Sequence, residues 1–564
     1  MNLETNNLSP GKNLPVLIID NLSVQVVGIP TTHYVVENIS FDVKPGEMLC
    51  VVGESGSGKS VTALSVMGLL PRGGLVPSGG AILVDGENVV TASQKRLREM
   101  RATRMAMVFQ EPMTALNPVV PVGKQIDEVL RVHTNLTKIE RREKVLSMLD
   151  SVHLPDVKRI YDAYPHQLSG GQRQRIVLSM ALILDPKLLI ADEPTTALDV
   201  TTQKQILFLI RELQEEHNTA VMFITHDFGV VAEIAERIVV MNRGRVVEVG
   251  QREDILARPR QAYTRMLVSS VPSLIPKMRQ APMGEIVLDV AALNKTYAEK
   301  RIFGSGRTVA AAQDVNLTLR RGEIVGVVGE SGSGKSTVAR CIVRLVDPTS
   351  GAIRIKGLDI AQAGGRKLRP FRRSTQIVFQ DPYRSLNPRR RVGDSIAEGL
   401  INFGAPREKA LAKAVESLRT VGLDPDVMQR YPHQFSGGQR QRICIARALA
   451  VEPDILVADE PVSSLDVSVQ AQVLKLLEEI RERTGIAVLF ITHDLRVAAQ
   501  ICDTIVVMQN GRIVEAGPAE TVLTRPQREY TRALIEAAPG RDWDFQNFRP
   551  VDANKAPIFS RVTL

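Results

Sequence analysis

Two eight-residue stretches carry the residue types that bind phosphate groups. The sequence GESGSGKS occupies residues 53–60 and recurs unchanged at 329–336. Small residues let backbone N–H groups turn inward and form an anion cradle at the start of a helix. The predicted phosphate-binding residues are Gly53, Glu54, Ser55, Gly56, Ser57, Gly58, Lys59 and Ser60, and Gly329, Glu330, Ser331, Gly332, Ser333, Gly334, Lys335 and Ser336.

Each phosphate-binding stretch has the strand and helix context that it needs. The apolar run MLCVV at 48–52 predicts a strand, and a helical pattern starts near Val61. In this context Lys59 is expected to reach the β- and γ-phosphates of a nucleotide, and the Ser60 hydroxyl to ligate Mg²⁺. Lys335 and Ser336 repeat these two roles in the second stretch.

A pair of adjacent acidic residues ends a short apolar run in each half of the chain. Asp192 closes the run Leu188–Asp192, and a carboxylate at that end of a buried parallel strand can supply an oxygen to Mg²⁺. The next residue, Glu193, is placed to orient or deprotonate an attacking water. Asp459 and Glu460 repeat the pair. Such pairs are usually just solvated, but downstream of a phosphate loop they predict phosphoryl transfer to water.

A third pattern, SGGQ, predicts a second anion site. Its serine reads as a helix N-cap, and its glycines allow close backbone approach. The phosphate loop already binds the nucleotide of its own domain. This second anion site therefore suggests that the SGGQ residues bind the γ-phosphate of a nucleotide held by another domain. The residues are Ser169, Gly170, Gly171 and Gln172, and Ser436, Gly437, Gly438 and Gln439.

The same motifs recur at a constant spacing, which indicates a duplicated domain rather than a solenoid of short units. The offset is 267 residues at Ser169/Ser436 and at Glu193/Glu460. Apolar, β-branched runs alternate with helical patterns, as in a parallel sheet covered on both faces. We expect a loose N-terminus at 1–14, a first domain at 15–271, a Pro-containing linker at 272–285, a second domain at 286–539 and a tail at 540–564.

Composition sets broad limits. The 564-residue chain has a net charge of +9, which allows nucleic acid or an anionic membrane as partner, although a solvated surface is the simpler interpretation. The N-terminus lacks a signal peptide and no apolar run is long enough to span a bilayer, so we expect a soluble, cytoplasmic chain. The four cysteines are widely spaced and are expected to be small buried residues.

The motifs resemble those of the ATP-binding cassette (ABC) family, over nearly the whole chain. Phosphate loop, SGGQ signature, acidic strand end and a strand-end histidine (in VMFITHD and VLFITHD) follow in order, twice. The resemblance implies an α/β fold with two tandem P-loop NTPase (ABC-type) nucleotide-binding domains, each with a helical subdomain and a C-terminal extension. It implies ATP and Mg²⁺ as cofactors. The implied catalytic residues are Glu193, Glu460, His226, His493, Gln110 and Gln380, and the implied Mg²⁺ residues are Ser60, Gln110, Asp192, Ser336, Gln380 and Asp459.

In that family the two domains pair head to tail. The resemblance therefore implies that the phosphate loop of each domain shares its nucleotide with the SGGQ residues of the other, and that Asp199 and Asp466 lie in the loop that crosses between sites. Tyr297 stands where the family places an aromatic residue that stacks on adenine. The first copy is aliphatic there, near Val26, and whether Tyr34 substitutes is left open.

Two further features resemble the ATPases of dipeptide, oligopeptide and nickel importers. Each glutamine opens a stretch of the type FQEPMTALNP or FQDPYRSLNP, and each copy closes with a segment such as ARPRQAYTRMLVSSVP or TRPQREYTRALIEAAP. The fusion of both cassettes most resembles the glutathione and peptide importer ATPases. Implied partners are two membrane-spanning permease subunits and, indirectly, a periplasmic binding protein, with the chain peripheral on the cytoplasmic face of the bacterial inner membrane.

Some members of that branch hold an iron–sulfur cluster, but neither extension here contains a cysteine, so none is expected. The alternative is a non-transport tandem ABC ATPase that acts on ribosomes or nucleic acid. The short, lightly charged segment Pro272–Glu285 differs from the long charged helical linker of such translation factors, and no nucleic acid partner is expected. The transported solute is left open by the sequence.

Overall fold

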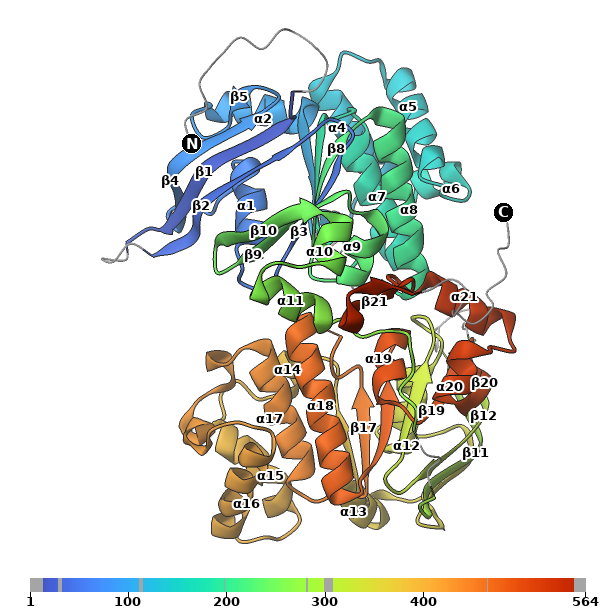
Figure 1. The fold of residues 1–564 in the computed structure, drawn as a ribbon. Helices are drawn as coiled ribbons and strands as arrows, with labels where there is room; N and C mark the ends of the chain where they lie inside the picture. Colours follow the sequence, from blue (N-terminus) through green and yellow to red (C-terminus); the bar gives the residue numbers. More distant parts are fainter. Residues whose placement is uncertain are drawn as a thin grey trace. The chain divides into compact units, whose positions relative to one another are not determined.

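The computed structural model describes residues 14–28, 33–110, 115–196, 198–279, 283–298, 308–463 and 465–551. The chain divides into two compact units (Figure 1), the first made of residues up to Val268 and the second of residues from Ser269 onward, with the short segment Asp199–Thr201 grouped with the second. The N-terminal residues 1–13, and the end of the expected tail at 552–564, lie outside the described residues.

The first unit is built on a largely parallel sheet whose described strands lie in the order β10-β9-β3-β8-β7-β6. The strands are β3 (Met48–Val52), β6 (Met105–Val108), β7 (Leu188–Asp192), β8 (Ala220–Thr225), β9 (Arg237–Asn242) and the antiparallel edge strand β10 (Arg245–Gln251). Every residue of β3, β7 and β8 is buried. Their uninterrupted apolar sequences are explained by this burial on both faces, so the predicted parallel sheet is confirmed.

An antiparallel sheet with the strand order β2-β1-β4-β5 completes the β-structure of the first unit. It consists of β1 (Leu17–Val26), β2 (Tyr34–Val43), β4 (Leu75–Val84) and β5 (Glu87–Asn88). Its inner face packs on the central sheet around residues such as Leu22, Ile39 and Ile82. This sheet and helices α4–α6 lie on opposite sides of the central sheet (Figure 1).

The helices of the first unit fall into a core set and a helical subdomain. The core set is α1 (Lys59–Val66), α2 (Gln94–Thr103), α8 (Val200–His217), α9 (Phe228–Ile234), α10 (Arg252–Ala257) and α11 (Ala262–Ser269), and the subdomain is α4 (Val122–His133), α5 (Lys138–Ser151), α6 (Val157–Tyr161) and α7 (Gly170–Leu182). On α8 the side chains of Ile206, Leu209, Ile210 and Leu213 are buried in the core of the unit. Helices α4–α7 are the helical subdomain that the sequence analysis expects for this unit.

The second unit repeats this arrangement with the strand order β16-β17-β18-β13-β19-β20 and a β12-β11-β14-β15 sheet. Its strands are β11 (Ile286–Ala298), β12 (Thr308–Arg320), β13 (Ile324–Val328), β14 (Ser350–Ile355), β15 (Leu358–Asp359), β16 (Thr375–Val378), β17 (Ile455–Asp459), β18 (Ala487–Ile491), β19 (Thr504–Gln509) and β20 (Arg512–Pro518). Its helices are α12 (Lys335–Ile342), α13 (Gly365–Ser374), α14 (Pro382–Ser385), α15 (Val392–Asn402), α16 (Arg407–Thr420), α17 (Gly437–Leu449), α18 (Val467–Thr484), α19 (Leu495–Ile501), α20 (Ala519–Thr524) and α21 (Glu529–Ala537).

The four cysteines are buried, as expected. Burial raises the pKa of the Cys50 and Cys502 thiols, and raises that of Cys341 and Cys444 to about 11. Among the described helices, none combines the length and the apolar character needed to cross a membrane.

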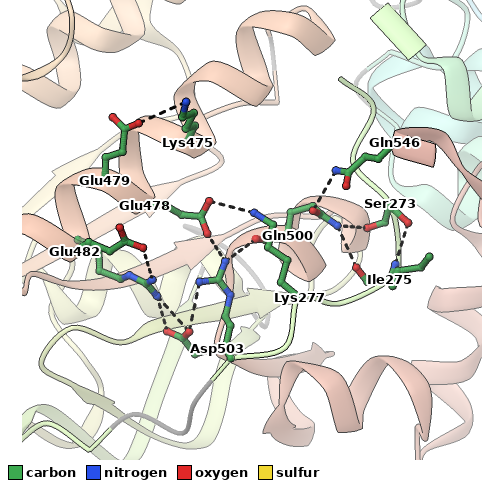
Figure 2. Close-up of polar contacts among 12 residues, drawn as sticks. Ser273, Ile275, Lys277, Lys475, Glu478, Glu479, Glu482, Gln500, Asp503 and Gln546 are labelled. Atoms are coloured by element: carbon green, nitrogen blue, oxygen red, sulfur yellow. Dashed lines mark hydrogen bonds and ion pairs between the residues drawn. The ribbon is translucent and has the colours of Figure 1, made fainter. Parts of the chain in front are cut away.

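The described part of the expected linker is held on the second unit (Figure 2). Arg279 binds the Glu478 carboxylate of α18, and its Nη2 donates to the carbonyl of Gln500 at 2.7 Å. The Gln500 amide of α19 in turn donates to the carbonyls of Ser273 and Ile275 at 2.8 and 3.2 Å. Residues 273–279 are therefore docked on α18 and α19.

The described part of the C-terminal tail also folds back on the second unit, an outcome that the sequence leaves undecided. It forms a short antiparallel pair, β21 (Trp543–Asp544) and β22 (Arg549–Pro550). Phe545 is fully buried beside Trp543. Gln546 donates to the Gln500 side chain at 3.4 Å, next to the docked linker segment (Figure 2).

Candidate active site: phosphate loops and acidic strand ends

Each phosphate loop joins a buried strand to a helix through residues in glycine-only conformations. The first helix, α1, begins at Lys59, two residues before the predicted start, and Gly58 caps it with a φ of 102°. A Cβ on Gly53 would lie 2.2 Å from the Met241 carbonyl oxygen, so a larger residue cannot fit there. In the second unit Gly334 has a φ of 103°, and a Cβ on Gly329 would lie 2.3 Å from the Met508 carbonyl. The predicted strand–loop–helix context is confirmed in both units.

The loop lysine is buried inside its own loop. The Lys59 ammonium donates to the carbonyls of Gly53 and Glu54 at 2.7 and 2.9 Å. Lys335 makes the same two contacts in the second unit, both at 2.7 Å. Burial lowers the pKa of Lys335, against the opposing pull of nearby carboxylates. A poorly hydrated cation at this point suits a phosphate group, which would supply the anionic partner.

A hydroxyl and a carboxylate from distant segments meet beside each loop. Ser60 Oγ donates to Asp192 Oδ1 at 3.3 Å, and Ser336 Oγ donates to Asp459 Oδ1 at 2.9 Å. Burial raises the pKa of both aspartates, and the serine hydrogen bond opposes the shift. A pair of hard oxygen donors next to a phosphate cradle fits Mg²⁺, which binds through a few protein oxygens, phosphate and water.

The carboxylate of Glu193 is the centre of a polar cluster. Its Oε1 lies 3.0 Å from His226 Nδ1, and its Oε2 accepts hydrogen bonds from Gln110 Nε2 at 2.9 Å and Thr196 Oγ1 at 3.1 Å. Burial pushes the pKa of Glu193 upward, but the hydrogen bonds of His226 and Thr196 and the charges of His226 and Lys59 together outweigh it, so the pKa lies below its ordinary value. The residue also has a left-handed φ of 47°, a conformation that is rare outside glycine and is found at functional sites.

The second unit builds the same cluster around Glu460. Its Oε2 lies 3.2 Å from His493 Nδ1 and accepts a hydrogen bond from Gln380 Nε2 at 2.9 Å. Its φ is 49°, and His493 again lowers the carboxyl pKa against the effect of burial. A carboxylate that is ionised at neutral pH can accept a proton from water. Both units therefore hold a carboxylate that is able to accept a proton, and its role as the general base stays a prediction.

The predicted roles of the glutamines are only partly addressed by this geometry. The amide nitrogens of Gln110 and Gln380 contact the glutamates, and their role as Mg²⁺ ligands stays a prediction. The residues that follow Phe109 and Gln110 at 111–114 lie outside the described residues. Sequence reasoning missed Thr196, whose signal would have been a hydroxyl three residues after the glutamate. The corresponding Ser463 hydroxyl donates to the Glu460 carbonyl at 3.2 Å.

The SGGQ residues form the capped helix tips that the sequence predicts. Ser169 is the N-cap of α7, with reciprocal hydrogen bonds to Gln172, and Ser436 and Gln439 do the same for α17. Such a capping box orders the first turn and leaves further N–H groups at the tip for an anion. Their pairing with the phosphate loop of the other unit stays a prediction.

The remaining predicted residues are placed as follows. Tyr297 lies on β11 with 42% of its surface exposed, and Lys295 Nζ lies 5.0 Å from its ring centroid. Tyr34 starts β2 and is 39% exposed. Both rings are accessible; adenine stacking on Tyr297 stays a prediction, and whether Tyr34 takes that role stays open. Asp466 is the N-cap of α18, and Asp199 directly precedes α8.

Two family models match this chain. The ABC transporter model matches residues 36–196 and 312–463, which contain both phosphate loops and both acidic strand ends. The model described as the oligopeptide/dipeptide transporter C-terminal region matches residues 247–301 and 514–556. The second model thus matches the end of each cassette, where the sequence predicts an extension.

Curated relatives match over nearly the full length. The glutathione import ATP-binding protein GsiA of Pectobacterium atrosepticum is 45% identical, covering 94% of this chain and 91% of that protein. The peptidoglycan transport ATP-binding protein YejF of Agrobacterium fabrum is 44% identical, covering 93% and 96%. A bacterial ABC transporter cassette solved as a dimer is 30% identical, covering 42% of this chain and 98% of that one at a TM-score of 0.38. The chain belongs to the ABC transporter family and is a tandem-cassette ATP-binding protein with ATPase activity.

Proposed function

We propose that this chain is the ATP-hydrolysing subunit of a binding-protein-dependent importer for peptides, of the dipeptide, oligopeptide or glutathione type. The observation that carries the proposal is the presence of a glutamate–histidine contact beside the phosphate loop of each unit, each followed by a match to the oligopeptide/dipeptide transporter C-terminal region. Glutathione import and peptidoglycan transport are the roles named for relatives that match over nearly the full chain.

At each site different residues bind the phosphates, hold Mg²⁺ and accept the proton during phosphoryl transfer to water. The loop N–H groups and Lys59 bind and orient the phosphates, and Ser60 and Asp192 are the residues that would hold Mg²⁺. When bound, that ion neutralises charge on the β- and γ-phosphates. Glu193, kept ionised by His226, accepts the proton of the attacking water. Lys335, Ser336, Asp459, Glu460 and His493 do the same in the second unit.

The coupling step is the pairing of the two cassettes on one polypeptide. We propose that each phosphate loop is completed by the SGGQ tip of the other cassette, so that the γ-phosphate is bound by donors from both. ATP then drives closure because it binds the closed pair better than the open one. Hydrolysis removes that difference and lets the pair reopen.

The proposed partners are two membrane-spanning permease subunits, to which the chain binds from the cytoplasmic face of the inner membrane. Substrate choice then rests with the permease cavity and a periplasmic binding protein. No iron–sulfur cluster is part of the proposal, because the extensions hold no cysteine.

Transport of a defined solute tests this function. The chain is co-expressed with candidate permease subunits and reconstituted into vesicles that enclose ATP and Mg²⁺. Uptake of a labelled dipeptide, oligopeptide or glutathione, dependent on the cognate binding protein, is the expected result. Failure of the chain to co-purify with permeases, together with co-sedimentation with ribosomes, would overturn the proposal in favour of a translation or nucleic acid role.

A further inference from the structure

In each unit a tyrosine of the C-terminal extension contacts that unit's own phosphate loop. Tyr263, near the start of α11, accepts a hydrogen bond at its hydroxyl from the backbone N–H of Glu54 at 3.3 Å. Tyr530, near the start of α21, accepts one from the backbone N–H of Glu330 at 3.2 Å. These partners are 209 and 200 residues apart in the sequence, so the contacts depend on the fold and not on local chain geometry.

The loop residue that each tyrosine holds is also a binding partner of the loop lysine. The Glu54 carbonyl accepts a hydrogen bond from Lys59 Nζ at 2.9 Å, while the Glu54 N–H donates to Tyr263. In the second unit the Glu330 carbonyl accepts from Lys335 Nζ at 2.7 Å. A single loop residue therefore links the extension to the ammonium group that binds phosphate.

The hydroxyl is suited to this contact because it stays neutral. Burial raises the pKa of Tyr530 to about 12, so its O–H is retained at physiological pH while its oxygen accepts the loop N–H. Tyr263 additionally donates to the Glu54 carboxylate at 3.4 Å. The repetition of one contact in two units, whose extensions read QAYTRMLV and REYTRALI, favours a role of the tyrosine itself over incidental packing.

We propose that Tyr263 and Tyr530 are positioning residues for ATP binding, which hold the first peptide group of each phosphate loop and, through it, the loop lysine. The extension is then a part of the nucleotide site as well as an appendage of the cassette. Because the hydroxyl touches the loop and not the reacting atoms, it is expected to support ground state and transition state alike. Such uniform binding affects KM more than kcat.

The test compares Tyr263→Phe, Tyr530→Phe and the double variant with the parent chain in steady-state ATPase assays. Phenylalanine keeps the ring and removes only the hydroxyl. We expect the KM for ATP of the double variant to rise about fivefold, the factor that corresponds to one lost neutral hydrogen bond at each site, while kcat changes less than twofold.

The neighbouring threonines provide a matched control. Thr264 and Thr531 are fully buried, and within the described residues their hydroxyls have no hydrogen-bond partner. Thr264→Val with Thr531→Val therefore changes the same helix turns without touching the loop, and should leave the KM unchanged. An unaltered KM in the tyrosine variants, or an equal rise in the threonine variants, would overturn the proposal.

Discussion

His493 Nδ1 lies 3.2 Å from a carboxylate oxygen of Glu460, whose side chain is mostly shielded from water, while the His493 side chain is about one-third exposed. Burial favours the neutral form of each group, because it raises the pKa of Glu460 and lowers the pKa of His493. The hydrogen bond and the charge interaction between the two residues oppose this effect. The pKa of Glu460 lies below its ordinary value, and the pKa of His493 lies above its ordinary value. Each shift favours the charged form of its group, so the Glu460 carboxylate is ionised at neutral pH and able to accept a proton.

The two pKa shifts define a pH window for the stability of this pair. The contribution of Glu460 is present above its ordinary pKa of 4.5 and is lost as the pH falls through the lower folded pKa. The contribution of His493 is complete below its ordinary pKa of 6.5 and is lost as the pH rises through the higher folded pKa. We expect His493→Asn to lower the thermal midpoint most between about pH 5 and pH 6.5, with a smaller difference in alkaline buffer.

Thermal unfolding followed across this pH range checks the prediction. His133→Asn is a suitable control, because His133 is exposed at the end of α4. A His493→Asn difference that stays constant into alkaline buffer would show that the histidine is neutral in the folded protein.

Replacing both proposed bases should separate ATP binding from hydrolysis. Glu193→Gln with Glu460→Gln keeps the shape of each side chain and removes its capacity to accept a proton. Steady-state hydrolysis should fall by about 100-fold or more, the range for loss of a general base, while ATP remains bound. Phosphate release and retention of labelled ATP are the two measurements. The control is Glu216→Gln with Glu529→Gln, at two exposed positions, which should behave as the parent. Normal turnover of the Glu193→Gln, Glu460→Gln variant would refute the assignment of the bases.

The hydroxyl next to each loop lysine should set the Mg²⁺ requirement. Ser60→Ala with Ser336→Ala removes one oxygen donor at each site and leaves a buried aspartate without its hydrogen bond. We expect the Mg²⁺ concentration for half-maximal ATPase activity to rise about tenfold. Ser60→Thr with Ser336→Thr keeps the hydroxyls and should restore the parent value. Titration of Mg²⁺ at saturating ATP measures this, and an unchanged requirement in the alanine variant would exclude both serines as ligands.

The sequence was most informative where chemistry and local structure coincide. The phosphate loop needs particular glycines, a strand before it and a helix after it, so GESGSGKS predicted the strand–loop–helix conformation that the structure has. Asp192 and Glu193 were predictable because a buried parallel strand ends there. The roles of Tyr263 and Tyr530 could not be read in this way, since each contacts a loop about 200 residues away. The same limit applies to Arg279, whose docking depends on charges brought together only by the folded second unit.

Docking of the linker segment should contribute to the stability of the second unit. Arg279 is largely buried and lies against Glu478 and Asp503, and Arg211 occupies the position on α8 that matches Glu478 on α18. The first unit therefore lacks the carboxylate that this arginine binds, and the docking is specific to the second.

We expect Arg279→Ala to lower the free energy of unfolding of the second unit by about 2 kcal/mol, between the values for exposed and fully buried ion pairs. Lys277, which pairs with the same glutamate but is about half-exposed, gives the matched control, and Lys277→Ala should cost less than about 1 kcal/mol. Urea unfolding followed by the fluorescence of Trp543, the single tryptophan of the chain, reports on this unit directly. Equal stabilities of the Arg279→Ala variant and the parent would mean that the docking of residues 273–279 does not stabilise the second unit.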